Sequence, residues 1–258
     1  MTPHRLTRGR VAFLSTRRLP LLTLQLLVFL LLGFLSAQIS YPKTPAGGRL
    51  AVVVDERLAA LRVTPELSGR LVRRLGRGRM VAIRGSRIVA DGLVFLLVNV
   101  TSRTHGWIQR EAVVSAARAG DDARLLDLIK ASEGFDRLVR ARIFLDYFVR
   151  SPLRPQVLLL LSEAAEEQAT KLSRDAAQRL GVERRTATNS TAPEFTYFLN
   201  YSGLDRYNRQ GVGFCFDRTT KRFHYDGAAL RELLRRHPNS PEATEARKRL
   251  AQLSQLKK

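Results

Sequence analysis

The hydrophobic pattern of the chain changes its period twice, and each change marks a predicted structural region. An almost uninterrupted apolar run covers residues 19–37. From Leu50 to about Val114, short apolar stretches alternate with Gly, Ser and Arg turns, which is typical of β-strands. After Ala116, apolar residues recur every three or four positions, as they do on amphipathic helices. We therefore predict an α+β protein with an N-terminal membrane segment, a small β-barrel and a helical region, in that order.

The apolar run predicts a membrane anchor or signal sequence within residues 1–40. It contains 19 residues, close to the about 20 residues that span a bilayer core. Five arginines and no acidic residue precede it, and basic residues beside an apolar span stay on the cytoplasmic side. We expect a single-pass protein of the bacterial inner membrane whose later residues lie outside the cytosol. Cleavage near Ala37 is the alternative and predicts a secreted or periplasmic protein, although Leu35 is not the small residue that such a site prefers.

The next stretch predicts a linker followed by a barrel. Residues 41–49 contain two prolines and two glycines, the composition of a flexible spacer. Residues 50–115 carry several short apolar runs, and this number of short strands in about sixty residues suggests a small barrel. The predicted strands are Leu50–Val54, Met80–Ile83, Leu93–Val100 and the segment around Trp107 and Ile108.

Residues 120–258 are predicted to form helices. Asp121 or Asp122 is a candidate N-cap for a helix that ends at Lys130. Gly181 is expected to end the third helix, because glycine is common just beyond a helix C-terminus. Ser240 followed by Pro241 is a start signal for the last helix. The remaining predicted helices are 135–149, 156–180 and 226–236.

An insert at about 184–226 interrupts the helical pattern. Its first part, 186–193, is rich in Thr, Asn and Ala and predicts a loop. Its second part alternates aromatic and polar residues on both sides of Asp217–Lys221, which predicts a β-hairpin with its aromatic side chains on one face. These rings are expected to cover the helical layer, and the alternative is an aromatic groove that binds a peptide.

The residues of the β-region resemble the bacterial SH3 domain family. An apolar and arginine-containing strand ends in proline at Leu61–Pro65, and a Gly-Trp pair followed by an apolar residue stands near the end as Gly106, Trp107 and Ile108. Phe95 or a neighbour occupies the place of a second tryptophan that such domains usually carry. The resemblance implies binding of a cell-wall peptide or an envelope protein, with Trp107 and Phe95 as candidate contacts. The alternative for Trp107 is a role in the barrel core.

The C-terminal region resembles tetratricopeptide-type repeats of envelope proteins. His237 to Ala251 carries the likeness, in which a helix ends in His and Pro before an alanine-rich helix. Pro152 with Pro155 and Pro238 with Pro241 share one spacing, which suggests two related helical hairpins. The Trp, Leu-Gly and Tyr pattern of that family is missing from the first helix. The resemblance implies that these hairpins mediate protein–protein interaction.

The sequence offers little for catalysis. Cys215 is the single cysteine, so the chain has no internal disulfide. Cys215 and nearby His224 are a conceivable nucleophile and base, but a small buried cysteine in a strand is the commoner case. No spacing of His, Cys, Asp or Glu predicts a metal site, and no glycine pattern predicts a cofactor loop. We therefore expect a non-enzymatic protein without a cofactor, and an enzyme with a site in the aromatic insert is the alternative.

Net charge leaves a second alternative open. The formal charge is +21, which suits anionic lipids or cell-wall polymers. Nucleic-acid binding is disfavoured, because the basic residues are scattered and lack interleaved aromatic side chains. The expected function is that of a cell-envelope binding or scaffold protein, and binding of polyanions by charge alone remains the competing interpretation.

Overall fold

The structure is a computed structural model that describes residues 49–186 and 192–255, all within one compact unit. The predicted membrane segment at 19–37, the region 1–40 and most of the predicted linker lie outside the described residues. Within the described ranges, no helix combines the length and the apolar character needed to cross a bilayer.

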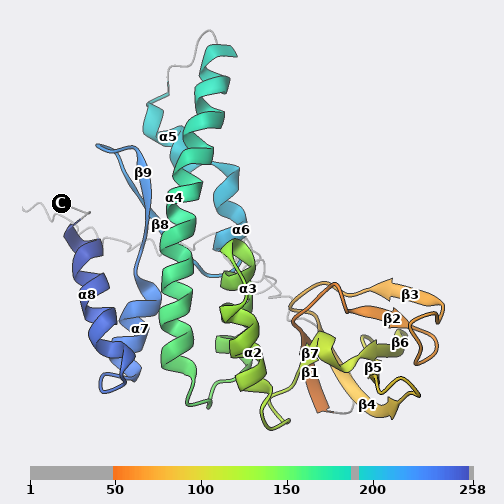
Figure 1. Cartoon of the computed structure of the whole chain (residues 1–258). Coiled ribbons are helices and arrows are strands. Elements are labelled where there is room, and N and C mark those ends of the chain that lie inside the picture. Colours follow the sequence, from red (N-terminus) through yellow and green to blue (C-terminus); the bar gives the residue numbers. More distant parts are fainter. Residues whose placement is uncertain (1–48, 187–191, 256–258) are drawn as a thin grey trace, which may run out of the picture. The chain divides into compact units, whose positions relative to one another are not determined.

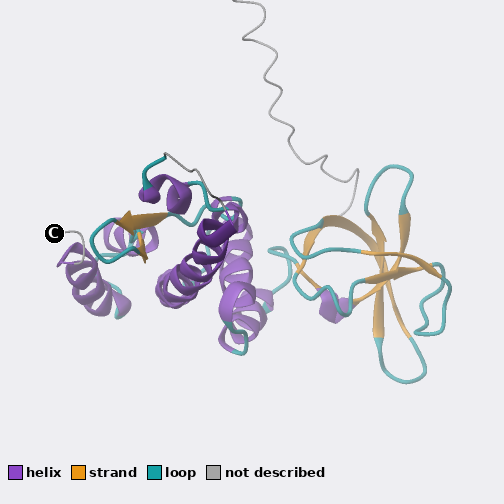
Figure 2. Ribbon diagram, turned by 90° about the horizontal axis from the view of Figure 1, so that it is seen from above, coloured by secondary structure: helices purple, strands orange, loops and turns teal. Residues whose placement is uncertain are grey.

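The first part of the described chain is a seven-stranded antiparallel sheet (Figures 1 and 2). Its strand order is β3-β2-β6-β5-β4-β1-β7, so β3 and β7 lie at the two ends. A 3₁₀ helix, Arg110–Ala112, connects the last two strands. The strands are β1 (Arg49–Val53), β2 (Ala60–Arg62), β3 (Leu71–Arg74), β4 (Met80–Ile88), β5 (Val94–Asn99), β6 (His105–Gln109) and β7 (Val113–Val114). The predicted β-region is confirmed.

Alternate residues of these strands form a hydrophobic core inside the sheet. Val53, Leu61, Val98 and Ile108 are fully buried there, each from a different strand. Their neighbours along each strand point to the opposite face, because successive side chains of a strand alternate. The sheet therefore has a buried inner face and an outer face that carries the remaining side chains.

The second part of the chain is helical and contains a two-stranded hairpin, as predicted. Its elements are α2 (Asp121–Lys130), α3 (Gly134–Tyr147), α4 (Arg154–Thr186), α5 (Glu194–Leu199), a 3₁₀ helix (Ser202–Leu204), α6 (Asp205–Asn208), β8 (Phe214–Asp217), β9 (Arg222–Tyr225), α7 (Ala228–Arg236) and α8 (Glu242–Gln255). The helix α4 runs through Gly181, so the prediction that this glycine ends the helix is wrong. Gly181 is not among the glycines with positive φ, and an interior glycine costs a helix only about 1 kcal/mol.

Two predicted helix caps differ from the structure. Gly120, with φ of 81°, precedes α2, and Asp121 lies inside its first turn. The Asp121 carboxylate instead accepts hydrogen bonds from the Ser115 amide at 2.7 Å and the Arg118 side chain at 2.8 Å. Helix α8 begins near Ser240 as predicted, but the Ser240 hydroxyl is buried without a hydrogen-bond partner among the described residues. The start signals are therefore correct, whereas the prediction that Asp121 or Asp122 is the N-cap of α2 is wrong.

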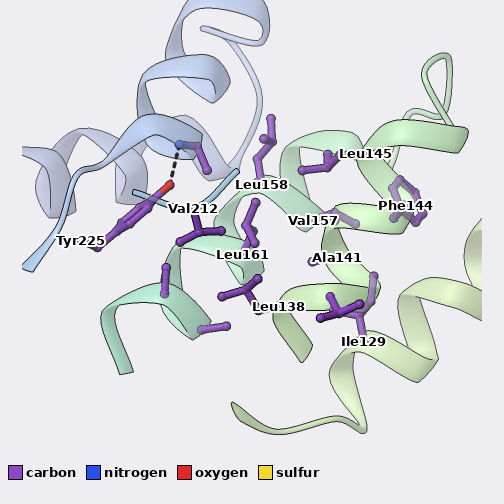
Figure 3. Close-up of a cluster of buried hydrophobic side chains, with 14 of the residues drawn as sticks. Ile129, Leu138, Ala141, Phe144, Leu145, Val157, Leu158, Leu161, Val212 and Tyr225 are labelled. Atoms are coloured by element: carbon purple, nitrogen blue, oxygen red, sulfur yellow. Dashed lines mark hydrogen bonds between the residues drawn. The ribbon is translucent and has the colours of Figure 1, made fainter. Parts of the chain in front are cut away.

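The helices and the hairpin enclose a second hydrophobic core (Figure 3). Its labelled members include Leu138 and Phe144 of α3 and Leu161 of α4, which belong to the same buried cluster as Tyr225 of β9. The Tyr225 hydroxyl accepts a hydrogen bond from the Ala229 amide at 2.7 Å, and this bond ties β9 to the start of α7. Burial raises the pKa of Tyr225 well above its usual range.

Helix α4 also supplies a hydrogen-bond partner for a backbone amide of β9. The Ser173 hydroxyl accepts a hydrogen bond from the Phe223 amide at 2.8 Å and donates to the Ala169 carbonyl at 2.7 Å. A buried amide without such a partner is costly, so this serine explains how a two-stranded hairpin packs against a helix. The aromatic face of the hairpin packs inward, where Phe216 stacks on Phe198 at 4.6 Å between ring centroids.

The sheet and the helices share part of one core. Val54 and Val114, from the sheet region, belong to the same buried cluster as Leu125 of α2 and Phe144 of α3. Buried Arg140 of α3 donates a hydrogen bond to the Val54 carbonyl at 3.2 Å. The two parts of the described chain are therefore joined by packing and by a buried polar contact.

Candidate functional site

A row of paired side chains crosses the outer face of the sheet, with a register shift between β2 and β3 beside Arg62. Leu71 of β3 lies opposite Arg62 of β2, Arg62 lies opposite Trp107 of β6, and Trp107 lies opposite Leu97 of β5. Residues directly opposite each other in neighbouring strands share one face of a sheet. The adjacent residue of β6, Ile108, is in the core, which places Trp107 and its row on the outer face. We call Leu71, Arg62, Trp107 and Leu97 the Trp107 row.

The Trp107 row combines apolar surface with one cation. Leu71 is 46% exposed, and Arg62, Trp107 and Leu97 are each half-buried. The Arg62 guanidinium donates a hydrogen bond to the Gly69 carbonyl at 2.7 Å, which holds this long side chain against the turn between β2 and β3. Tryptophan and arginine are enriched among the residues that contribute most to binding energy at protein interfaces, and here a partly accessible tryptophan lies beside an ordered arginine.

Phe95, the other predicted contact, is not accessible. It lies on the same face of β5 as Leu97, two residues away, so the structure does bring it near Trp107. Its side chain is only 1% exposed, with Arg87 and Gln109 as its register partners. A ligand on the outer face therefore meets Trp107 and not Phe95, whose burial indicates a packing role.

Gly106 explains why a glycine precedes Trp107. A Cβ atom at this position would lie 2.6 Å from the Arg62 carbonyl oxygen and 3.0 Å from Leu61 Cγ. Such distances are far below van der Waals contact, so β2 and β6 approach this closely only at a glycine. The Gly-Trp pair thus fixes the position of Trp107 beside Arg62.

Exposed apolar side chains concentrate next to the Trp107 row. Val63, Leu67, Leu71 and Val72 are all exposed, and they belong to β2–β3 and the turn between them. Every residue of β3 is exposed. The sequence pattern did not reveal this surface, because two apolar residues followed by two arginines show neither strand alternation nor a turn signal.

The structure places Cys215 and His224 directly opposite each other in the β8–β9 hairpin. Cys215 is half-buried, and the buried Nε2 atom of His224 has no hydrogen-bond partner among the described residues. His224 lines a groove of about 660 Å³ between α4 and β9, whereas Cys215 does not. Among the described residues, this groove is therefore not shared by Cys215, and no hydrogen bond holds the His224 Nε2 atom in place.

The groove beside His224 is lined by basic side chains. Arg174 of α4 and Lys221 and Arg222 of the hairpin face it, and Glu166 lies among its lining residues. Glu166 is paired with Arg249 of α8 at 3.3 Å. Within residues 49–186 and 192–255, no group of three or more His, Cys, Asp or Glu residues is arranged to hold a metal ion.

Comparison with known protein families, with curated proteins and with solved structures finds no match for this chain.

Proposed function

We propose that the chain is a non-enzymatic scaffold protein of the bacterial cell envelope, and that its β-sheet is an SH3-like barrel that recognises a cell-wall peptide or an envelope protein. The observation that carries this proposal is the Trp107 row. Its side chains place apolar surface on both sides of one held cation, on the outer face of a sheet whose inner face is filled. Surfaces of this kind bind peptides, because an aromatic anchor supplies apolar contact and an arginine orients a polar group.

The helical region supports a second contact in the same scaffold. The hairpins α3–α4 and α7–α8 each join two amphipathic helices through a proline-containing break, at Pro152 and Pro238 respectively. We propose that they are tetratricopeptide-like hairpins that bind a partner protein. Two helical hairpins are fewer than the about three repeats that a free-standing array requires. The helical hairpins therefore rely on packing against the β-hairpin β8–β9 and the sheet.

The test of the central proposal is co-sedimentation of the full-length protein with purified peptidoglycan. Trp107→Ala should weaken binding about 30-fold, because truncation of an anchoring tryptophan costs about 2 kcal/mol. Cys215→Ala is the matched control and should bind as the wild type does. Equal binding by both variants contradicts the proposed site.

The competing functions predict different outcomes. The Cys215–His224 pair favours an enzyme only if Cys215→Ala abolishes the cellular phenotype while truncation of α7 and α8 leaves it intact. Charge-driven binding to polyanions predicts a steep loss of affinity with rising salt and little effect of Trp107→Ala.

The proposed location rests on the apolar run at 19–37. We propose that it anchors the protein in the inner membrane with its C-terminus outside the cytosol, or that it is removed near Ala37. A C-terminal alkaline phosphatase fusion should be active, since this enzyme requires disulfides that form outside the cytosol. Activity of a cytosolic reporter alone would overturn the assignment.

A further inference from the structure

We propose that β3 binds an extended acidic peptide segment as an additional strand of the sheet. The proposal rests on the proposed recognition function of the barrel and names the chemistry of its partner. It is carried by three features of β3: an open backbone edge, exposed apolar side chains, and arginines that form no ion pair with the described residues.

The backbone edge of β3 is free on the side away from β2. β3 is the end strand of the sheet, and no other strand of the described chain pairs with it. The Leu75 amide points toward β2, since it donates to the Ala59 carbonyl at 2.9 Å. Bonded and non-bonded pairs alternate in an antiparallel ladder, and Arg74 opposite Ala60 is therefore a non-bonded pair. The N–H and C=O groups of Arg74 point to the open edge.

The edge of β3 is short and carries two arginines, but its apolar side chains are also exposed. Natural sheets commonly shield an edge strand by shortening it, covering it or placing charges and prolines on it. Here Leu71 and Val72 are 46% and 43% exposed, and Leu67 in the preceding turn is 51% exposed. The combination of open backbone and apolar surface fits the addition of a strand, in which backbone hydrogen bonds give affinity and side-chain contacts give specificity.

The positive charge along β3 favours an acidic peptide as the partner. Arg70, Arg73 and Arg74 make no ion pair within the described chain, and all three are exposed. Glu66 is the only acidic residue between Ala60 and Gly78. A second copy of this chain is disfavoured, because pairing two β3 edges would gather the arginines of both copies in one short segment. An acidic strand has the complementary charge.

The contact between this edge and the Trp107 row gives the ligand a continuous path. Leu71 belongs to both, and it lies opposite Arg62, which in turn lies opposite Trp107. A strand on β3 therefore places its side chains next to the apolar strip on the outer face. The peptide recognised by the barrel is expected to be extended, with acidic and apolar residues in alternation.

The test uses full-length protein in detergent and a fluorescent peptide of alternating Glu and Val. A peptide of alternating Glu and Pro is the control, since it has the same charge but lacks half of the backbone donors. Binding is followed by fluorescence anisotropy. We expect saturable binding of the Glu-Val peptide and at least tenfold weaker binding of the Glu-Pro peptide. Equal affinity for the two peptides would overturn the proposal in favour of attraction by charge alone.

Two variants of Arg74 distinguish the contribution of its backbone amide to peptide binding from that of its charge. Arg74→Ala removes the cation and keeps the amide, whereas Arg74→Pro removes both without touching the ladder to β2. We expect Arg74→Pro to bind the Glu-Val peptide about fivefold more weakly than Arg74→Ala, the effect of one backbone hydrogen bond. Equal affinities would contradict strand addition. Thermal unfolding of both variants checks that the sheet is intact.

Hydrogen exchange provides a measurement that needs no variant. The Arg74 amide of the wild-type protein should exchange rapidly alone and become protected when the Glu-Val peptide binds. An unprotected amide in the saturated complex refutes the proposal even if Arg74→Pro fails to fold. Loss of peptidoglycan binding by Trp107→Ala is a separate readout, so failure of the edge site and failure of the proposed function are distinguishable.

Discussion

Gly106 illustrates how a single residue determines the geometry of the candidate surface. Its missing side chain lets the Arg62 carbonyl approach, and this approach sets Trp107 beside Arg62. Ser173 has a comparable role in the helical region, where its hydroxyl satisfies the Phe223 amide. Both residues are small, and their importance lies in what a larger or apolar replacement would do to a neighbouring backbone group.

Gly106→Ala should destabilise the protein by about 1–3 kcal/mol, because the added methyl group overlaps the Arg62 carbonyl and forces the strands apart. Urea unfolding measures the change. Gly85→Ala is the matched control, since a Cβ at this strand position has no atom within 4 Å. An equal effect of the two substitutions would contradict the account of the Gly-Trp pair.

Ser173→Ala should cost about 1–3 kcal/mol of unfolding free energy, because it leaves the buried Phe223 amide without a partner. Ser254→Ala removes an exposed hydroxyl from α8 and should change stability by less than about 0.5 kcal/mol. Thermal unfolding of both variants measures the two changes in stability. An unchanged stability of Ser173→Ala would contradict the role assigned to this hydroxyl.

Among the helices and strands, hydrophobic periodicity correctly predicted those elements whose structure follows from their own local sequence. The hairpin β8–β9 follows its alternation of aromatic and polar residues, and α2 and α8 begin near their predicted start signals. The strand β3 was not predicted, because its pairing with β2 depends on contacts outside its own four residues. Gly181 was assigned to a helix end from its residue type, but the helix α4 continues through it.

The same distinction applies to the candidate site. The resemblance of Gly106, Trp107 and Ile108 to a known motif led to Trp107, which the structure places on the outer face. The burial of Phe95 and the opposition of Arg62 to Trp107 depend on strand register. Register between strands distant in sequence has no local signal, so this part of the site required the structure.

An ion pair between the β3–β4 turn and α3 predicts a pH effect. Arg77 donates to both carboxylate oxygens of Asp136, at 2.7 and 3.1 Å, and these bonds lower the pKa of Asp136 below its usual value. A lowered pKa in the folded state adds stability above the unfolded pKa of about 3.9, and this stability is lost as the pH falls through the folded value. Solvent screening limits the effect, because Asp136 is 54% exposed.

Asp136→Asn should therefore lower stability at pH 7 and flatten the acid limb of the stability profile. Asp146 serves as the control, because its pKa is shifted in the opposite direction. Burial raises the pKa of Asp146 and penalises its charged form. Asp146→Asn should not lower stability at pH 7 through ionisation. Urea unfolding between pH 2.5 and pH 7 distinguishes them, and parallel profiles for the wild type and Asp136→Asn would contradict the assignment.

At the scale of the whole described chain, the shared core predicts cooperative unfolding. Val54 and Val114 pack with Leu125 and Phe144, and Arg140 bonds to the Val54 carbonyl. Sheet and helices therefore lose contacts together when either unfolds. The sequence suggested separate barrel and helical regions because its period changes near Ala116, but periodicity carries no information on packing between regions.

Trp107 reports on the sheet alone, since it is the only tryptophan of the chain. Its fluorescence and the helical circular dichroism at about 222 nm should follow one urea transition with the same midpoint. Leu125→Ala should lower the free energy of unfolding by about 2–5 kcal/mol and shift the midpoints of both transitions together. Two separated transitions would show that the sheet and the helices unfold independently.

Titration with soluble peptidoglycan fragments, followed by the emission of Trp107, shows whether the ligand binds on this face of the sheet. We expect a saturable change in emission wavelength, with a midpoint that matches the affinity found by co-sedimentation. Binding that saturates without any change in Trp107 emission would place the ligand elsewhere and contradict the assignment of this face.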